Sequence, residues 1–152
     1  MSRFIVCAFL IGVVAGLRCL TAPAVVSWGV RLGRLRPESA MLAFLGYAAT
    51  PYIFSVLAVG ELIADQLPKA PSRKAPPGFI TRIVTGALCG AVFGDLDQAL
   101  VAGAIAGVAG AVAGTFGGYE ARVRLARVVE KDLPVALIED MIAIGGAVLL
   151  VR

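Results

Sequence analysis

Long apolar stretches constrain this chain more than any other feature. Of its 152 residues, 59% are hydrophobic and only 16% are charged, and the mean hydropathy is +0.90. A soluble domain carries about a quarter charged residues. In hydrocarbon the backbone must satisfy its own hydrogen bonds, which leaves helices or a closed barrel. Because the apolar residues run continuously and do not alternate, the sequence predicts an all-α integral membrane protein. We expect one domain, a bundle of about five to seven membrane segments.

Some of these segments are too short to cross a bilayer squarely. Residues 22–32 and 39–49 either cross the membrane as a pair or form re-entrant segments, which enter and leave the membrane on the same side. Thr50 and Pro51 are typical of an N-cap and the first helical position. The expected segments are 4–17, 22–32, 39–49, 51–67, 80–94, 98–118 and 133–151.

Two charged stretches separate the later segments. Residues 69–78 are rich in proline and charge, which predicts an extended cytoplasmic linker. Residues 120–132 form a charged connector or a helix at the membrane interface.

The basic residues gather between apolar segments. This is the positive-inside pattern of a bacterial inner-membrane protein, so the formal net charge of +4 does not indicate nucleic-acid binding. With the basic stretches 69–82 and 119–131 in the cytoplasm, seven segments place the N-terminus and 31–36 inside and Arg152 outside. The clusters are Arg31, Arg34 and Arg36; Lys69, Arg73 and Lys74; and Arg122, Arg124, Arg127 and Lys131.

The chain has no histidine, so common zinc sites and histidine-based triads are excluded. Cys7, Cys19 and Cys89 have no metal-binding spacing and are expected as buried packing residues. We therefore expect no cofactor, no metal and no enzyme activity, with a lipid-modifying enzyme as the third alternative.

Four acids lie inside apolar segments, where a charge costs roughly 2.5–3.5 kcal/mol on insertion scales. Glu61 and Asp65 are one helical turn apart and share a face; Glu139 and Asp140 lie on a second helix. At 1.5 Å per residue, Glu61 and Glu139 are each about 9 Å from the cytoplasmic ends of their segments, so a shared acidic cluster is expected.

Candidate charge partners lie near the same side of the membrane, namely Lys69, Arg73 and Arg82. Arg18 and Thr21 are expected nearer the opposite side. Together with the four acids, Arg18 and Thr21 are the candidate ion- or substrate-binding residues.

Glycines recur at intervals of four, which forms flat helix faces for close packing. Packing within the chain is the simpler interpretation; in the alternative, the face 103–118 meets a second copy in a homodimer. The glycines assigned to packing are Gly86, Gly90, Gly103, Gly107, Gly110, Gly114 and Gly118.

A weak internal similarity relates the segment from Arg3 to the segment from Arg82, which divides the chain into halves 1–70 and 78–152. If the halves are repeats, the expected topology makes them parallel. Chance similarity between helices rich in alanine, valine and glycine is the alternative.

Three motifs, GLRCLTAP at 16–23, GELIADQLPKAPSR at 60–73 and LPVALIED at 133–140, resemble a family of small, multi-spanning bacterial membrane proteins catalogued as a domain of unknown function. The resemblance runs over most of the chain. Cys19 stands where a serine is expected. The resemblance implies an inner-membrane location and draws attention to the charged residues of the three motifs, without naming a substrate.

The leading functional hypothesis is a small transporter or channel-like protein that passes or binds a small ion or solute at the acidic cluster. The alternative is a membrane scaffold or lipid-binding protein in which the acids are internal staples.

Overall fold

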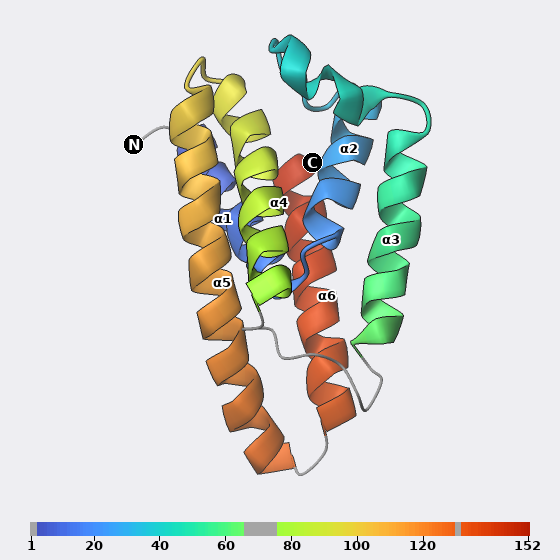
Figure 1. Cartoon of the computed structure of the whole chain (residues 1–152), viewed down its shortest axis with the longest axis vertical. Coiled ribbons are helices and arrows are strands. Elements are labelled where there is room, and N and C mark those ends of the chain that lie inside the picture. Colours follow the sequence, from blue (N-terminus) through green and yellow to red (C-terminus); the bar gives the residue numbers. More distant parts are fainter. Residues whose placement is uncertain (1–2, 66–75, 130–131) are drawn as a thin grey trace.

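The computed structural model describes residues 3–65, 76–129 and 132–152, and these form helices without any strand. Six α-helices run up and down the bundle, and a short 3-10 helix lies across one end (Figure 1). In chain order they are α1 (Arg3–Leu17), α2 (Thr21–Arg31), η1 (Ala40–Gly46), α3 (Thr50–Ala64), α4 (Pro76–Asp95), α5 (Leu100–Val129) and α6 (Asp132–Val151).

Helix α5 packs between α1 and α4, with the backbones in close contact. A Cβ atom built on Gly94 would lie 2.6 Å from the Cα of Gly103, and one built on Gly110 would lie 3.0 Å from the Cα of Gly12. Lipid supplies no hydrophobic drive between helices, so such backbone contact is a main source of their association. The packing glycines at these contacts are Gly86, Gly90, Gly103, Gly107, Gly110 and Gly114.

The glycine face of α5 is therefore occupied within the chain. Helices α1 and α4 cover it from 103 to 114, so these glycines pack within the chain, as in the simpler interpretation. Gly118 lies beyond these contacts and lines a groove between α5 and α6.

The order of these contacts fixes the helix directions. Gly12 meets Gly107 and Gly16 meets Ala111, so α1 and α5 are parallel. Gly86 meets Ala111 whereas Gly94 meets Gly103, so α4 is antiparallel to both. The expectation of parallel repeats is wrong, because the first helices of the two halves run in opposite directions.

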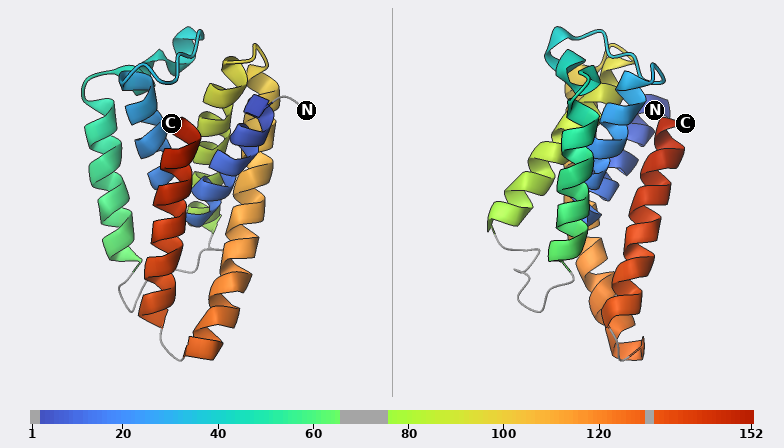
Figure 2. Two further views of the ribbon diagram at one scale, coloured as in Figure 1. Left: turned by 180° about the vertical axis from the view of Figure 1, so that it is seen from behind. Right: turned by 90° about the vertical axis from the view of Figure 1, so that its right-hand side faces the viewer.

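Both chain ends lie at the same end of the bundle (Figure 2). The segment 39–49 was expected as a membrane segment, but η1 lies across the bundle end (Figure 1). The Ser39 backbone N–H donates to Asp95 Oδ2 at 2.9 Å, which joins η1 to the end of α4. Without a crossing there, the expectation that the N-terminus and Arg152 lie on opposite sides is wrong.

Several boundaries differ from the expected ones. Thr50 is already helical; its hydroxyl donates to the Phe44 carbonyl at 2.7 Å and caps nothing in α3. Residues 76–78 open α4, and the rest of the expected linker lies outside the described residues. Residues 120–129 continue α5 as one helix of 30 residues, because no proline interrupts them.

Three helical stretches are long and apolar enough to cross a membrane: Pro76–Asp95, Leu100–Leu125 and Pro134–Val151. The pair η1 and α3, bent by 70°, would make a fourth span. Helix α1 is apolar but shorter. These stretches indicate a membrane protein.

Candidate functional site

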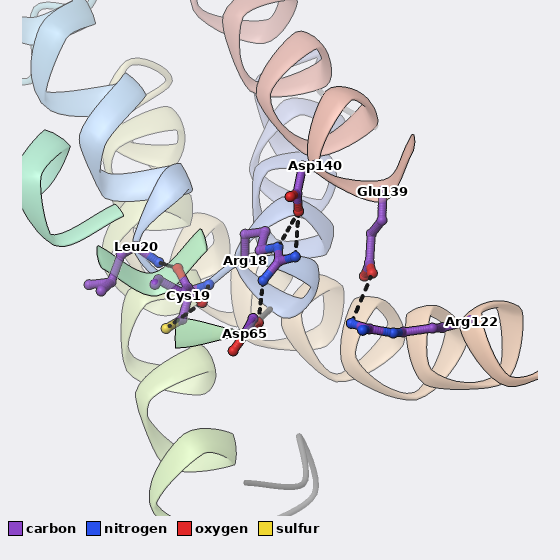
Figure 3. Close-up of polar contacts among 8 residues, drawn as sticks. Arg18, Cys19, Leu20, Asp65, Arg122, Glu139 and Asp140 are labelled. Carbon is purple, nitrogen blue, oxygen red and sulfur yellow. Dashed lines mark hydrogen bonds and ion pairs between the residues drawn. The ribbon is translucent and has the colours of Figure 1, made fainter. Parts of the chain in front are cut away.

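Arg18 lies between α1 and α2 and is fully buried. Its Nε donates to Asp140 Oδ1 on α6 at 2.6 Å, and its Nη2 forms an ion pair with the same carboxylate. Its Nη1 donates to Asp65 at the end of α3 (Figure 3). We call Arg18, Asp65 and Asp140 the Arg18 triad. One guanidinium joins three separate parts of the bundle.

The lengths of α1 and α2 explain the depth of Arg18. With 15 and 11 residues, the two helices are about 22 Å and 16 Å long, less than the ~30 Å of a hydrocarbon core. They meet at Arg18–Leu20, beside the middle of the longer helices (Figure 1). The expectation that Arg18 and Thr21 lie near the opposite side from the acids is therefore wrong.

Glu61 on α3 binds the beginning of α2. One carboxylate oxygen, Oε1, accepts from the Cys19 backbone N–H at 2.9 Å and lies 3.1 Å from the Cys19 thiol sulfur; Oε2 accepts from the Leu20 backbone N–H at 2.8 Å (Figure 3). A helix N-terminus offers unpaired N–H groups and a positive dipole end, which suit a carboxylate. Glu61 therefore accepts hydrogen bonds from backbone N–H groups that lose their helical partners at the break between α1 and α2.

Glu139 precedes Asp140 on α6 but belongs to a different contact. Its Oε2 lies 3.9 Å from Nη1 of Arg122 on α5 (Figure 3). Both side chains are largely buried, at 10% and 19% exposed. The structure thus brings Asp65 and Asp140 together on Arg18, places Glu61 beside them, and turns Glu139 toward α5.

The other candidate residues have different positions. Thr21 is buried at the start of α2, and its hydroxyl has no hydrogen-bond partner. Arg82 is buried in α4, at 5% exposed. Lys69 and Arg73 lie outside the described residues.

Sequence reasoning missed two sets of contacts. Arg122 lies in the stretch predicted as a charged connector or an interfacial helix, and the absence of proline and glycine from 119 to 129 was the sequence signal that α5 continues there. The contacts of the Cys19 and Leu20 backbone N–H groups do not depend on side-chain type, so the sequence does not reveal them. Only the break between two short helices indicates N–H groups that need a partner.

The Arg18 triad carries one positive and two negative formal charges, a net charge of −1. No group of three or more His, Cys, Asp or Glu side chains within the described residues is arranged to hold a metal ion. The contacts that the structure shows at the triad are ion pairs and hydrogen bonds.

Comparisons with protein families, curated proteins and solved structures found no match to this chain.

Proposed function

We propose that this chain is a multi-pass protein of the bacterial inner membrane that binds or passes a small ion at the Arg18 triad. The observation that carries the proposal is a fully buried arginine between two helices too short to span, bound by two aspartates. Ionisable residues at membrane depth mark ion pathways, and broken helices are typical of transporter binding sites. The candidate spans and the basic residues gathered between apolar segments support the location.

The net charge of the triad favours a proton or a monovalent cation over an anion. One guanidinium neutralises one carboxylate, and the second negative charge needs a further positive partner in a medium of low dielectric constant. Arg82, buried on α4 and in electrostatic contact with Cys19, is a fixed cation near this centre. A proton on Asp65 or Asp140, or a cation bound beside them, is the exchangeable partner. Asp65 is the accessible member, with 24% of its side chain exposed.

Exchange of a proton or a cation at Asp65 is expected to move helix α3. Figures 1 and 2 show it at the edge of the bundle beside α2. Its upper half is fastened to α2: Trp28 Nε1 donates to Ser55 Oγ at 3.1 Å, and the Trp28 and Tyr52 rings meet edge-on at 5.1 Å. Its lower half is joined to the bundle through Glu61 and Asp65. Neutralising Asp65 weakens the lower attachment while the upper one persists.

The test is a flux assay in liposomes that contain the purified chain. Protons, sodium, potassium and chloride are offered in turn, and the wild type is compared with Asp65→Asn and Glu61→Gln. Glu120→Gln is the matched control, because Glu120 is exposed and pairs with Arg124 on the surface of α5.

The proposal expects flux of at least one cation or of protons in the wild type and in Glu120→Gln, with Asp65→Asn strongly reduced. Absence of flux for every ion offered, with the protein shown to be folded and inserted, contradicts it. So does equal flux in Asp65→Asn and the wild type.

The charge pairing of Arg18 and the backbone contacts of Glu61 favour a second candidate, a membrane scaffold. Arg18 is 0% exposed and serves both aspartates, and Glu61 is held by backbone N–H groups. In that case the acids are internal staples. Asp65→Asn then lowers thermal stability, and neither variant nor wild type shows flux.

A further inference from the structure

A groove of about 250 Å³ lies between α5 and α6 and reaches Leu17 at the end of α1. It shares no residue with the Arg18 triad, although Leu17 and Glu139 are chain neighbours of Arg18 and Asp140. Eight of its ten lining residues are glycine or apolar, among them Leu17, Leu125, Ile138 and Ile142. The other two are Arg122 and Glu139. The surface of the groove is almost entirely apolar, and the Arg122–Glu139 ion pair lies at its lining. We call it the α5–α6 groove.

The groove lies at the depth of the candidate membrane spans. Apart from Leu17, its lining residues fall within Leu100–Leu125 and Pro134–Val151. Ile138 and Ile142 are 55% and 62% exposed, so they form an open margin and not a sealed core. In a bilayer, lipid acyl chains surround membrane-spanning helices, so they would lie against this open margin.

The charges along the last turns of α5 are mostly basic, and Glu139 on α6 offsets one of them, Arg122. Arg122 lines the groove, and Arg124 and Arg127 follow on the last turns of α5. Glu120 is the one acid from 119 to 129, and it pairs with Arg124. A guanidinium has five N–H donors, so Arg122 can serve Glu139 and an anionic headgroup together. Basic residues at the end of a span attract anionic lipid headgroups.

We infer that the α5–α6 groove binds an anionic phospholipid, with part of one acyl chain along the apolar wall and the phosphate at Arg122. The groove volume is below the roughly 300 Å³ at which pockets for drug-sized ligands begin. A single flexible chain fits such a space better than a bulky ligand does. The groove contains no residue of the Arg18 triad, and the inference does not depend on ion flux.

The probes are phosphatidylglycerol and phosphatidylcholine with identical acyl chains, which differ in headgroup charge. The purified full chain is incubated in detergent with an equal mixture of both, and native mass spectrometry counts the lipids retained. Because hydrogen bonds to charged groups contribute more than neutral ones, we expect about a tenfold preference for one phosphatidylglycerol.

Two variants test the two parts of the site. Arg122→Gln removes the cation and is expected to abolish the preference for phosphatidylglycerol; Arg34→Gln, an exposed arginine at the other end of the bundle, is the matched control. Gly117→Leu fills the groove and is expected to reduce retention of both lipids. A Cβ at Gly117 meets nothing within 4 Å, so the substitution begins in open space, and circular dichroism checks that the variant keeps its fold. Gly145→Leu, equally open on α6 and outside the groove, is its control.

Equal retention of the two lipids by the wild type overturns the inference. An equal loss of preference in Arg34→Gln and Arg122→Gln also overturns it, because the attraction is then a property of the whole charged surface. If Arg122→Gln does not fold, Gly117→Leu decides: undiminished lipid retention in that variant overturns the inference.

Discussion

At the Arg18 triad, one cation holds two carboxylates from helices that are distant in the sequence. Asp65 and Asp140 lie 47 and 122 residues from Arg18 along the chain. Removing one partner of a buried ion pair leaves an uncompensated charge, which costs about 3–5 kcal/mol. Replacing all partners by neutral groups of similar size avoids that cost.

Arg18→Met is therefore expected to lower the free energy of unfolding by about 3–5 kcal/mol, since it leaves both aspartates without their cation. The triple variant Arg18→Met, Asp65→Asn, Asp140→Asn is expected to recover most of the loss. Thermal unfolding in detergent, followed by circular dichroism, measures both. A triple variant no more stable than the single one would show that charge pairing is not what stabilises this centre.

The sequence identified these acids but not their partner. Carboxylates inside apolar stretches are visible in any reading of the chain, and their spacing places Glu61 near Asp65 and Glu139 near Asp140. The depth of Arg18 depends on where α1 ends and α2 begins, because a junction at the membrane surface and one at its middle look alike in sequence.

Among the helices, α5 has the largest share of close backbone contacts, because α1 and α4 both pack on its glycines. A Cβ at Gly107 would overlap the backbone carbonyl of Gly86 and lie 3.0 Å from the Cα of Gly90. Neither neighbour is a flexible side chain that can give way.

Gly107→Ala is expected to destabilise the bundle by separating α4 from α5. The matched substitution Gly117→Ala, where a Cβ meets nothing within 4 Å, is expected to be neutral or to stabilise by up to about 1 kcal/mol through helix propensity. Thermal unfolding of both variants gives the comparison. Equal effects of the two substitutions would contradict the packing role of Gly107.

The helical segments themselves were predictable from apolar runs, to within a few residues for α1, α2 and α6. The errors arose where polar residues continue a helix, as at 120–129 in α5, or where an apolar stretch does not cross, as in η1. In both cases the apolar run does not match the element: α5 extends beyond its apolar run, and the apolar run of η1 does not form a membrane-crossing helix.

For the whole molecule, the arrangement places η1 and both chain ends at one end of the bundle and the last turns of α5 at the other (Figure 1). In the sequence, 66–75 and 119–131 carry seven lysines and arginines, against three in 31–36. From the positive-inside rule we predict that the end of α5 faces the cytoplasm and η1 the opposite side.

Cysteine labelling in intact cells and in inverted vesicles tests this orientation. In a background with Cys7, Cys19 and Cys89 replaced by alanine, Arg127→Cys is expected to react with an impermeant maleimide only from the cytoplasmic side, and Arg36→Cys only from the outside. Both arginines are exposed. Labelling of both cysteines from the same side would rule out the six-helix arrangement in the membrane.

The excess negative charge of the Arg18 triad is most directly measured by infrared difference spectroscopy of the protein in lipid. As the pH or the cation in the buffer is changed, the C=O signal of one carboxyl group per molecule is expected to change. That change should be absent from the double variant Asp65→Asn, Asp140→Asn. An unchanged difference spectrum in the double variant would show that the triad exchanges neither a proton nor a cation.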